Sequence, residues 1–131
     1  MFFSLSKAFV ALAAVTAAIA STVPSKRQDG LVSCDLLLKP TVHVDSSTTN
    51  LFAEFNFVIG RSLAIDANGV IDGGSGSTIL AENADNSFLV NDKISAQGET
   101  SAETAAIITG WVGETKEGLV ANWLVESATC T

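Results

Sequence analysis

His43 is the single histidine of the 131-residue chain, so any Ser-His-Asp triad must use it. His43 and Asp45 are two residues apart and would share one face of a strand. Serines are abundant, but Gly74-Ser75-Gly76-Ser77 does not have the Gly-x-Ser-x-Gly spacing of a nucleophile elbow. We therefore expect His43 to be an exposed, non-catalytic histidine and predict no catalytic residue.

Carboxylates are numerous, with 14 Asp and Glu in the chain. A pair of them could act as acid and base on a glycoside, but that needs a groove and one pKa raised by burial, neither of which the sequence reveals. A hydrolase that uses His43 or paired carboxylates stays open as an alternative.

Metal and cofactor sites are not predicted. One histidine and two cysteines fall short of the ligands that a zinc site needs. The segment from Asp66 to Asp72 lacks the ligand order and closing glutamate of an EF-hand, and we expect a β-turn there. No lysine or helix start follows Gly73-Gly74-Ser75-Gly76, so this cluster is not a phosphate loop.

Trp111 and Trp123 are the candidate ligand-binding residues. An indole at a barrel mouth can serve as a platform for a sugar or another flat apolar ligand. The competing interpretation is that both indoles pack in the core.

The first 20 residues have the pattern of a signal peptide. Lys7 precedes an apolar run of about a dozen residues, too short for a membrane span of roughly 20. The run ends in Ala18-Ile19-Ala20, which predicts cleavage after Ala20. We therefore expect a secreted, extracellular protein without a membrane anchor after cleavage.

A second cleavage is predicted on a pair of basic residues. Residues 21–27 form a short pro-segment that ends in Lys26-Arg27, a pair typical of kexin-type processing sites, and cleavage there would leave Gln28 as the first residue. The alternative is a solvated basic pair in an N-terminal tail. The order of signal, pro-segment and Lys-Arg resembles the precursors of small secreted fungal proteins, a resemblance that concerns processing alone.

Processing makes the remaining chain strongly acidic. Residues 28–131 keep four Lys and Arg and all 14 acids, a net charge of −10. Nucleic acids and anionic membranes attract basic patches, which this region lacks, so neither is expected as a partner.

Residues 28–131 have the length of one domain. Cys34 lies near its start and Cys130 near its end, and in an oxidising compartment the pair is expected to form a disulfide that joins the two ends. Such a long closed loop stabilises the fold by about 4 kcal/mol in chain-entropy terms.

Two-residue alternation of apolar side chains predicts an all-β domain. Strands are expected over 32–38, 42–45, 51–59 and 77–80, a hairpin around Asn68-Gly69, and a C-terminal hairpin of 104–112 with 119–126. Segment 101–106 could instead form one helical turn. About seven or eight short strands favour a small antiparallel β-sandwich or closed β-barrel.

These observations lead to three hypotheses. The first is a non-enzymatic secreted protein that acts by surface contact with an extracellular protein, a cell wall or its own kind. The second is a module that binds a small ligand or glycan near Trp111 or Trp123. The third is the hydrolase.

Overall fold

The computed structural model describes residues 30–131. The predicted signal peptide (1–20), the pro-segment (21–27) and the processing residues Ala20, Lys26 and Arg27 therefore lie outside the described residues, as does the predicted start at Gln28.

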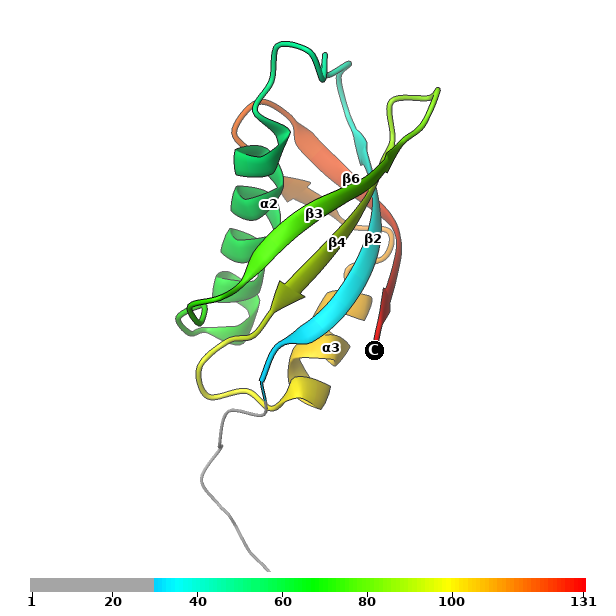
Figure 1. Cartoon of the computed structure of the whole chain (residues 1–131). Helices are drawn as coiled ribbons and strands as arrows, with labels where there is room; N and C mark the ends of the chain where they lie inside the picture. Colours follow the sequence, from blue (N-terminus) through cyan, green and yellow to red (C-terminus); the bar gives the residue numbers. More distant parts are fainter. Residues whose placement is uncertain (1–29) are drawn as a thin grey trace, which may run out of the picture.

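One open antiparallel sheet of five strands forms the framework, in the order β3-β4-β2-β6-β5. Its strands are β2 (Val32–Pro40), β3 (Gly76–Glu82), β4 (Phe88–Ile94), β5 (Thr115–Glu117) and β6 (Asn122–Cys130). Two helices, α2 (Leu51–Ala67) and α3 (Ser101–Thr109), cover one face of the sheet (Figure 1). The result is a two-layer domain, with the core between the helices and the sheet.

The connections interleave two split β-α-β units. In the first unit, β2 and β3 are joined by α2, run parallel to each other and have β4 between them. In the second unit, β4 and β6 are joined through α3, run parallel to each other and have β2 between them. This is the β-α-β-β-α-β order of the ferredoxin-like motif, to which β5 adds a short edge strand. Three strands, β4, β2 and β6, are thereby paired on both sides.

The predicted fold class is therefore confirmed only in its coarser form. The domain is mostly β and antiparallel, but the sheet stays open, and helices take the place of a second sheet. The prediction of a β-sandwich or closed barrel is not supported by this arrangement.

The segment 51–59, predicted as a strand, forms the first half of α2. Its buried residues recur at helical spacing, as Leu51, Phe55, Val58 and Ile59 show. Asn50 caps the helix, since its Oδ1 accepts a hydrogen bond from the Ala53 N–H at 3.1 Å.

The Asn68-Gly69 hairpin is also corrected, because this pair ends α2. Asn68 adopts the left-handed conformation (φ 53°), and the Gly69 N–H donates to the Ala64 carbonyl at 3.1 Å. The tolerance of positive φ that suggested a hairpin turn serves here to end a helix.

The segment 104–112 is helical in its first part and not a strand. Thr100 and Glu103 form a reciprocal capping box at the start of α3, so the helical alternative for residues 101–106 is confirmed. The expected strand at 42–45 is a loop in which the Asn86 side chain bonds both the N–H and the C=O of Val44, at 2.7 and 2.9 Å.

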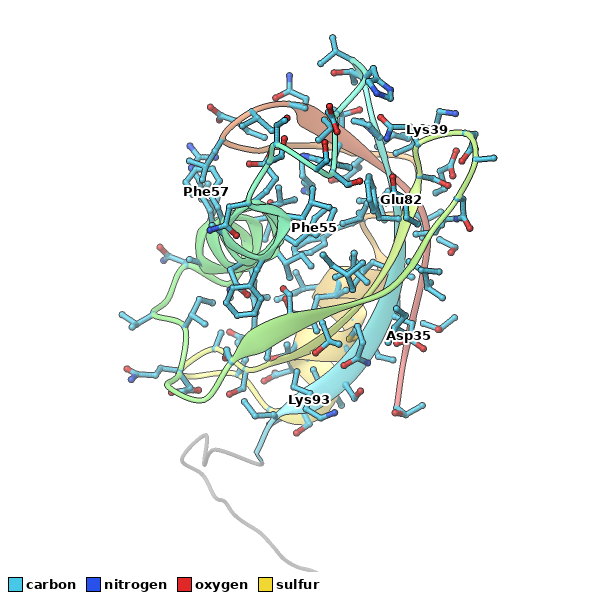
Figure 2. All side chains as sticks on the ribbon, turned by 45° about the horizontal axis from the view of Figure 1, so that its top comes forward. Asp35, Lys39, Phe55, Phe57, Glu82 and Lys93 are labelled. Atoms are coloured by element: carbon cyan, nitrogen blue, oxygen red, sulfur yellow. A yellow bond between two sulfur atoms is a disulfide. The ribbon has the colours of Figure 1, made fainter. Side chains whose placement is uncertain are left out.

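Three aromatic rings from three elements form a cluster in the core. Phe55 of α2 projects toward the sheet (Figure 2), with ring centroids 5.6 Å from Phe88 and 4.8 Å from Trp123. Apolar residues of β2, β4, β6 and both helices surround this cluster, which fixes α2 against the sheet.

The predicted disulfide between Cys34 and Cys130 is confirmed. It joins register-paired positions of β2 and β6, 96 residues apart in sequence. No helix within residues 30–131 is long and apolar enough to cross a membrane.

Candidate functional site: a pocket at the buried carboxyl of Asp92

A pocket of about 400 Å³ opens between the C-terminal half of α2, the loop that follows it, and strands β3 and β4. We call it the Asp92 pocket. Its volume lies in the range of small-molecule sites. Three groups of residues line it: Asn56, Phe57, Gly60 and Arg61 of α2; Ile71, Ser75 and Gly76 before and at the start of β3; and Asp92 and Ile94 of β4.

Two glycines help to keep this space open. A Cβ atom added at Gly60 or at Gly76 would have no heavy atom within 4 Å. Gly60 stands on α2 and Gly76 begins β3, so the helix and the edge strand both present bare backbone to the pocket. Larger side chains at these positions would occupy the pocket and not the core.

Asp92 is the unusual residue of the lining. Alternation along β4 directs Phe88, Val90, Asp92 and Ile94 to the helix-covered face, so an acid lies in an apolar row. The residue is 1% exposed. The Ser77 hydroxyl donates to Asp92 Oδ2 at 2.9 Å, whereas Oδ1 is buried and has no hydrogen-bond partner among the described residues.

Burial raises the pKa of Asp92 to about 7, although the Ser77 hydrogen bond acts in the opposite direction. The neighbours of Asp92 in the sheet are Cys34 and Ser77, neither of which supplies a positive charge. The carboxyl group therefore changes its charge near neutral pH, a property that occurs often at functional sites.

Asn56 connects the helix to the sheet beside this carboxyl. Its Oδ1 accepts a hydrogen bond from the Ser77 N–H at 3.0 Å. Because Oδ1 is engaged by the backbone of β3, the amide Nδ2 is left as a donor at the pocket lining.

Arg61 lies on the solvent side of the pocket. One guanidinium nitrogen is 3.1 Å from Glu117 Oε1, and the guanidinium carbon is 5.9 Å from the centre of the Phe57 ring. Arg61 is thus neutralised by a neighbouring carboxylate, and Asp92 is the only acidic residue of the lining.

The turn between α2 and β3 is fixed by hydrogen bonds around Asp72. The Ser75 hydroxyl donates to the Asp72 carbonyl at 2.8 Å, and the Ser95 hydroxyl donates to Asp72 Oδ2 at 2.9 Å. This places a second carboxylate next to the pocket lining. The segment from Asp66 to Asp72, expected to be a β-turn, is instead the end of α2 and this loop.

The two tryptophans lie elsewhere, in the core. Trp123 is fully buried, and its indole N–H donates to Glu54 Oε2 at 2.8 Å. Trp111 is 2% exposed, and its indole N–H donates to Asp66 Oδ2 at 2.7 Å. Neither residue lines the Asp92 pocket.

Glu54 organises the loop before β6. Its carboxylate, 1% exposed, accepts hydrogen bonds from the backbone N–H groups of Leu119 and Val120 at 2.9 and 3.1 Å, besides the Trp123 indole. A Cβ at Gly118 would collide with Glu54 Oε2 and the Ala121 carbonyl. The loop is therefore held closely, although the Leu119 and Val120 side chains are 61% and 55% exposed.

His43 lies in the exposed loop between β2 and α2. The Ser47 hydroxyl donates directly to Asp45 Oδ1 at 2.7 Å, so this serine and this acid are bonded to each other without an imidazole between them. Ser47 hydrogen bonds lower the pKa of Asp45, and His43 adds a smaller effect in the same direction.

Within the described 30–131 region, no group of three or more His, Cys, Asp and Glu side chains could hold a metal ion. No protein-family model matches the chain, and no curated protein or solved structure is significantly similar to it.

Proposed function

We propose that this chain is a small secreted, non-enzymatic protein that binds a small ligand in the Asp92 pocket. The observation that carries the proposal is a pocket lined by Asp92, a buried carboxyl group whose Oδ1 atom has no hydrogen-bond partner among the described residues. A buried polar atom without a partner costs about 1 to 3 kcal/mol, and a ligand that bonds to it recovers part of that cost.

The walls of the pocket suit a ligand with an apolar body. Phe57, Ile71 and Ile94 supply apolar surface, while Asn56, Ser75 and Asp92 supply polar groups at a few points. Small-molecule sites combine these two features, since the apolar walls give affinity and the polar groups fix orientation.

Two observations support a non-enzymatic role. Asp92 is the only carboxyl group of the lining, and the nearby Asp72 carboxylate lies beside the lining and is bonded to Ser95, whereas most glycosidases act with two carboxyl groups across the bond. His43, the histidine that the hydrolase alternative would use, lies in a different part of the domain, in the loop between β2 and α2.

Secretion is part of the same proposal. A disulfide between the first and last long strands is typical of proteins that fold in an oxidising compartment. The signal-like residues 1–20 and the Lys26-Arg27 pair supply the corresponding route.

A thermal-shift screen of residues 28–131 with sugars and small apolar molecules tests the ligand-binding proposal. We expect hits that raise the unfolding temperature of the wild-type protein and fail to do so for Gly60→Leu, which fills the pocket. Hits that stabilise both proteins equally would place binding elsewhere, and a screen without hits would contradict the proposal.

Surface contact is the second candidate function, favoured by the Glu54-held loop. Leu119 and Val120 are exposed on a loop whose backbone is fixed by a buried carboxylate, so two apolar side chains are presented at little entropic cost. Self-association is the form of contact that the chain alone can test. Sedimentation velocity should then show a dimer that Leu119→Ser and Val120→Ser together abolish; a wild-type protein that stays monomeric at millimolar concentration would contradict it.

A further inference from the structure

The Asp92 pocket combines an apolar lining with a carboxyl group that has no cationic partner. Among the described residues, Lys39 is paired with Asp85, and Lys116 with Asp66 and Glu114. Arg61, the only cation of the lining, is paired with Glu117. Lys93, the remaining Lys or Arg of this region, follows Asp92 on β4 and is exposed on the opposite face of the strand. No basic side chain of residues 30–131 is thus bonded to Asp92, and the missing positive charge can come from a ligand.

We infer that the Asp92 pocket takes a small organic cation, a primary ammonium group on an apolar body, with the ammonium group against the Asp92 carboxylate. This inference rests on the proposed ligand-binding function and names its ligand class. An ammonium group brings three donors and one positive charge, and so satisfies both the free Oδ1 atom and the uncompensated charge of ionised Asp92.

The surroundings of the pocket favour this charge. Asp72 lies in the turn beside the lining, where its carboxylate accepts a hydrogen bond from the Ser95 hydroxyl. Net charge over residues 28–131 is −10, which attracts cations and repels anions at long range. A neutral alcohol of the same shape could bond to Oδ1 but would not be attracted by the negative net charge.

The charged groups around Asp92 define how binding should depend on pH. α2 contributes Arg61, the turn contributes Asp72, and the flanking strand positions, Cys34 and Ser77, contribute none that titrates. Because burial raises the pKa of Asp92 to about 7, roughly one tenth of it is ionised at pH 6 and roughly nine tenths at pH 8. An alkylammonium ion stays charged over this range. Its affinity should therefore rise by up to about tenfold from pH 6 to pH 8.

Three ligands of nearly equal shape test the inference: 2-phenylethylammonium, 2-phenylethanol and 3-phenylpropanoate. Each is titrated into the wild-type protein at pH 6 and pH 8, and binding is followed by the backbone amide signals of residues 56–61 and 92–94 in ¹H-¹⁵N spectra. We expect the ammonium ion to bind at least tenfold more tightly than the other two at pH 8, and to lose affinity toward pH 6.

Asp92→Asn should remove both the preference for the ammonium ion and its pH dependence. Asp35→Asn is the matched control, because Asp35 is an exposed acid on β2 whose side chain lies on the face of the sheet away from the helices (Figure 2). This control should keep both properties. The three titrations of the wild-type protein test the preference for the ammonium ion even if Asp92→Asn does not fold.

The outcomes distinguish an error in the ligand class from an error in the proposed ligand-binding function. If the alcohol or the carboxylate binds as tightly as the ammonium ion, or if ammonium affinity rises toward pH 6, the ligand class is wrong while the ligand-binding function stands. If none of the three shifts the pocket signals at millimolar concentration, and the thermal-shift screen also has no hits, the proposed function is wrong as well.

Discussion

Ser77 and Asp92 face each other across the β3–β4 pair, with the serine hydroxyl 2.9 Å from one carboxyl oxygen and no group of residues 30–131 bonded to the other. The contact is buried, and it lies at the point where α2 leaves a pocket against the edge of the sheet. A single hydroxyl does not offset the burial of an ionised carboxyl group, and the raised pKa of Asp92 follows from that imbalance.

Stability should therefore fall as Asp92 ionises. A carboxyl pKa raised from 3.8 to about 7 means that the folded protein holds a proton that the unfolded chain releases, so this contribution is complete below pH 4 and is lost as the pH rises to about 7. The loss is on the order of 4 kcal/mol. Urea unfolding at pH 4 to 8 measures it, and Asp92→Asn should flatten this part of the profile.

Asp85 provides an internal comparison for that experiment. Hydrogen bonds from Ser87 lower the pKa of this exposed aspartate to about 2, so its effect on stability is confined to pH values below about 4. A wild-type profile that stays level between pH 4 and pH 7, with Asp92→Asn parallel to it, would contradict the assignment to Asp92.

Gly60→Leu should stabilise the protein while it blocks the pocket. Leucine is favoured over glycine inside a helix by up to about 1 kcal/mol, and the new side chain meets no atom near its Cβ. Chemical denaturation should show a higher midpoint, and pocket ligands should lose at least tenfold in affinity. Gly60→Ala, which adds a single methyl group, should keep most of the affinity. Destabilisation by Gly60→Leu would mean that the space is not open.

Glu54→Ala should be strongly destabilising. The substitution leaves the buried Trp123 indole and the N–H groups of Leu119 and Val120 without their acceptor, a loss on the order of 3 kcal/mol. Urea unfolding measures the change. Glu126→Ala is the control, because Glu126 is exposed on β6 and should change stability by less than about 0.5 kcal/mol. Equal effects of the two substitutions would contradict this role of Glu54.

Replacement of both cysteines by alanine should cost about 4 kcal/mol, because the bond closes a loop of nearly the whole described chain. Denaturation of the oxidised wild type, the reduced wild type and the double variant gives the comparison. A difference below 1 kcal/mol between oxidised and reduced protein would show that the two strand ends stay together without the bond.

The sequence predicts β2 correctly from local alternation, β3 from the segment that follows the glycine cluster, and the disulfide from the number of cysteines. The sequence predicts a strand where α2 begins, because apolar residues are so frequent there that the two-residue period of a strand and the 3.6-residue period of a helix both fit. Leu51, Phe55 and Ile59 belong to the strand pattern and to the buried helix face alike. The deciding signal lies further along, at Ser62 and Leu63, which continue the helical spacing beyond the predicted strand.

The Asp92 pocket was missed for a different reason. An acid at an inward position among Phe88, Val90 and Ile94 is a visible signal, but alternation in β4 has to be followed to notice it. The space itself is a tertiary property, since it depends on Gly60 of a helix lying opposite Gly76 of a strand. A pattern that treated 51–59 as a strand could not bring these two glycines together.

The most direct test of ligand binding in the Asp92 pocket is a residue-resolved ¹H-¹⁵N map of the protein with a hit from the thermal-shift screen. We expect the shifted signals to come from residues 56–61, 75–77 and 92–94, with the two indole N–H signals of Trp111 and Trp123 unchanged. Shifts centred on the indole signals, with the pocket signals unmoved, would contradict binding in the Asp92 pocket and would show that the ligand binds at the tryptophans.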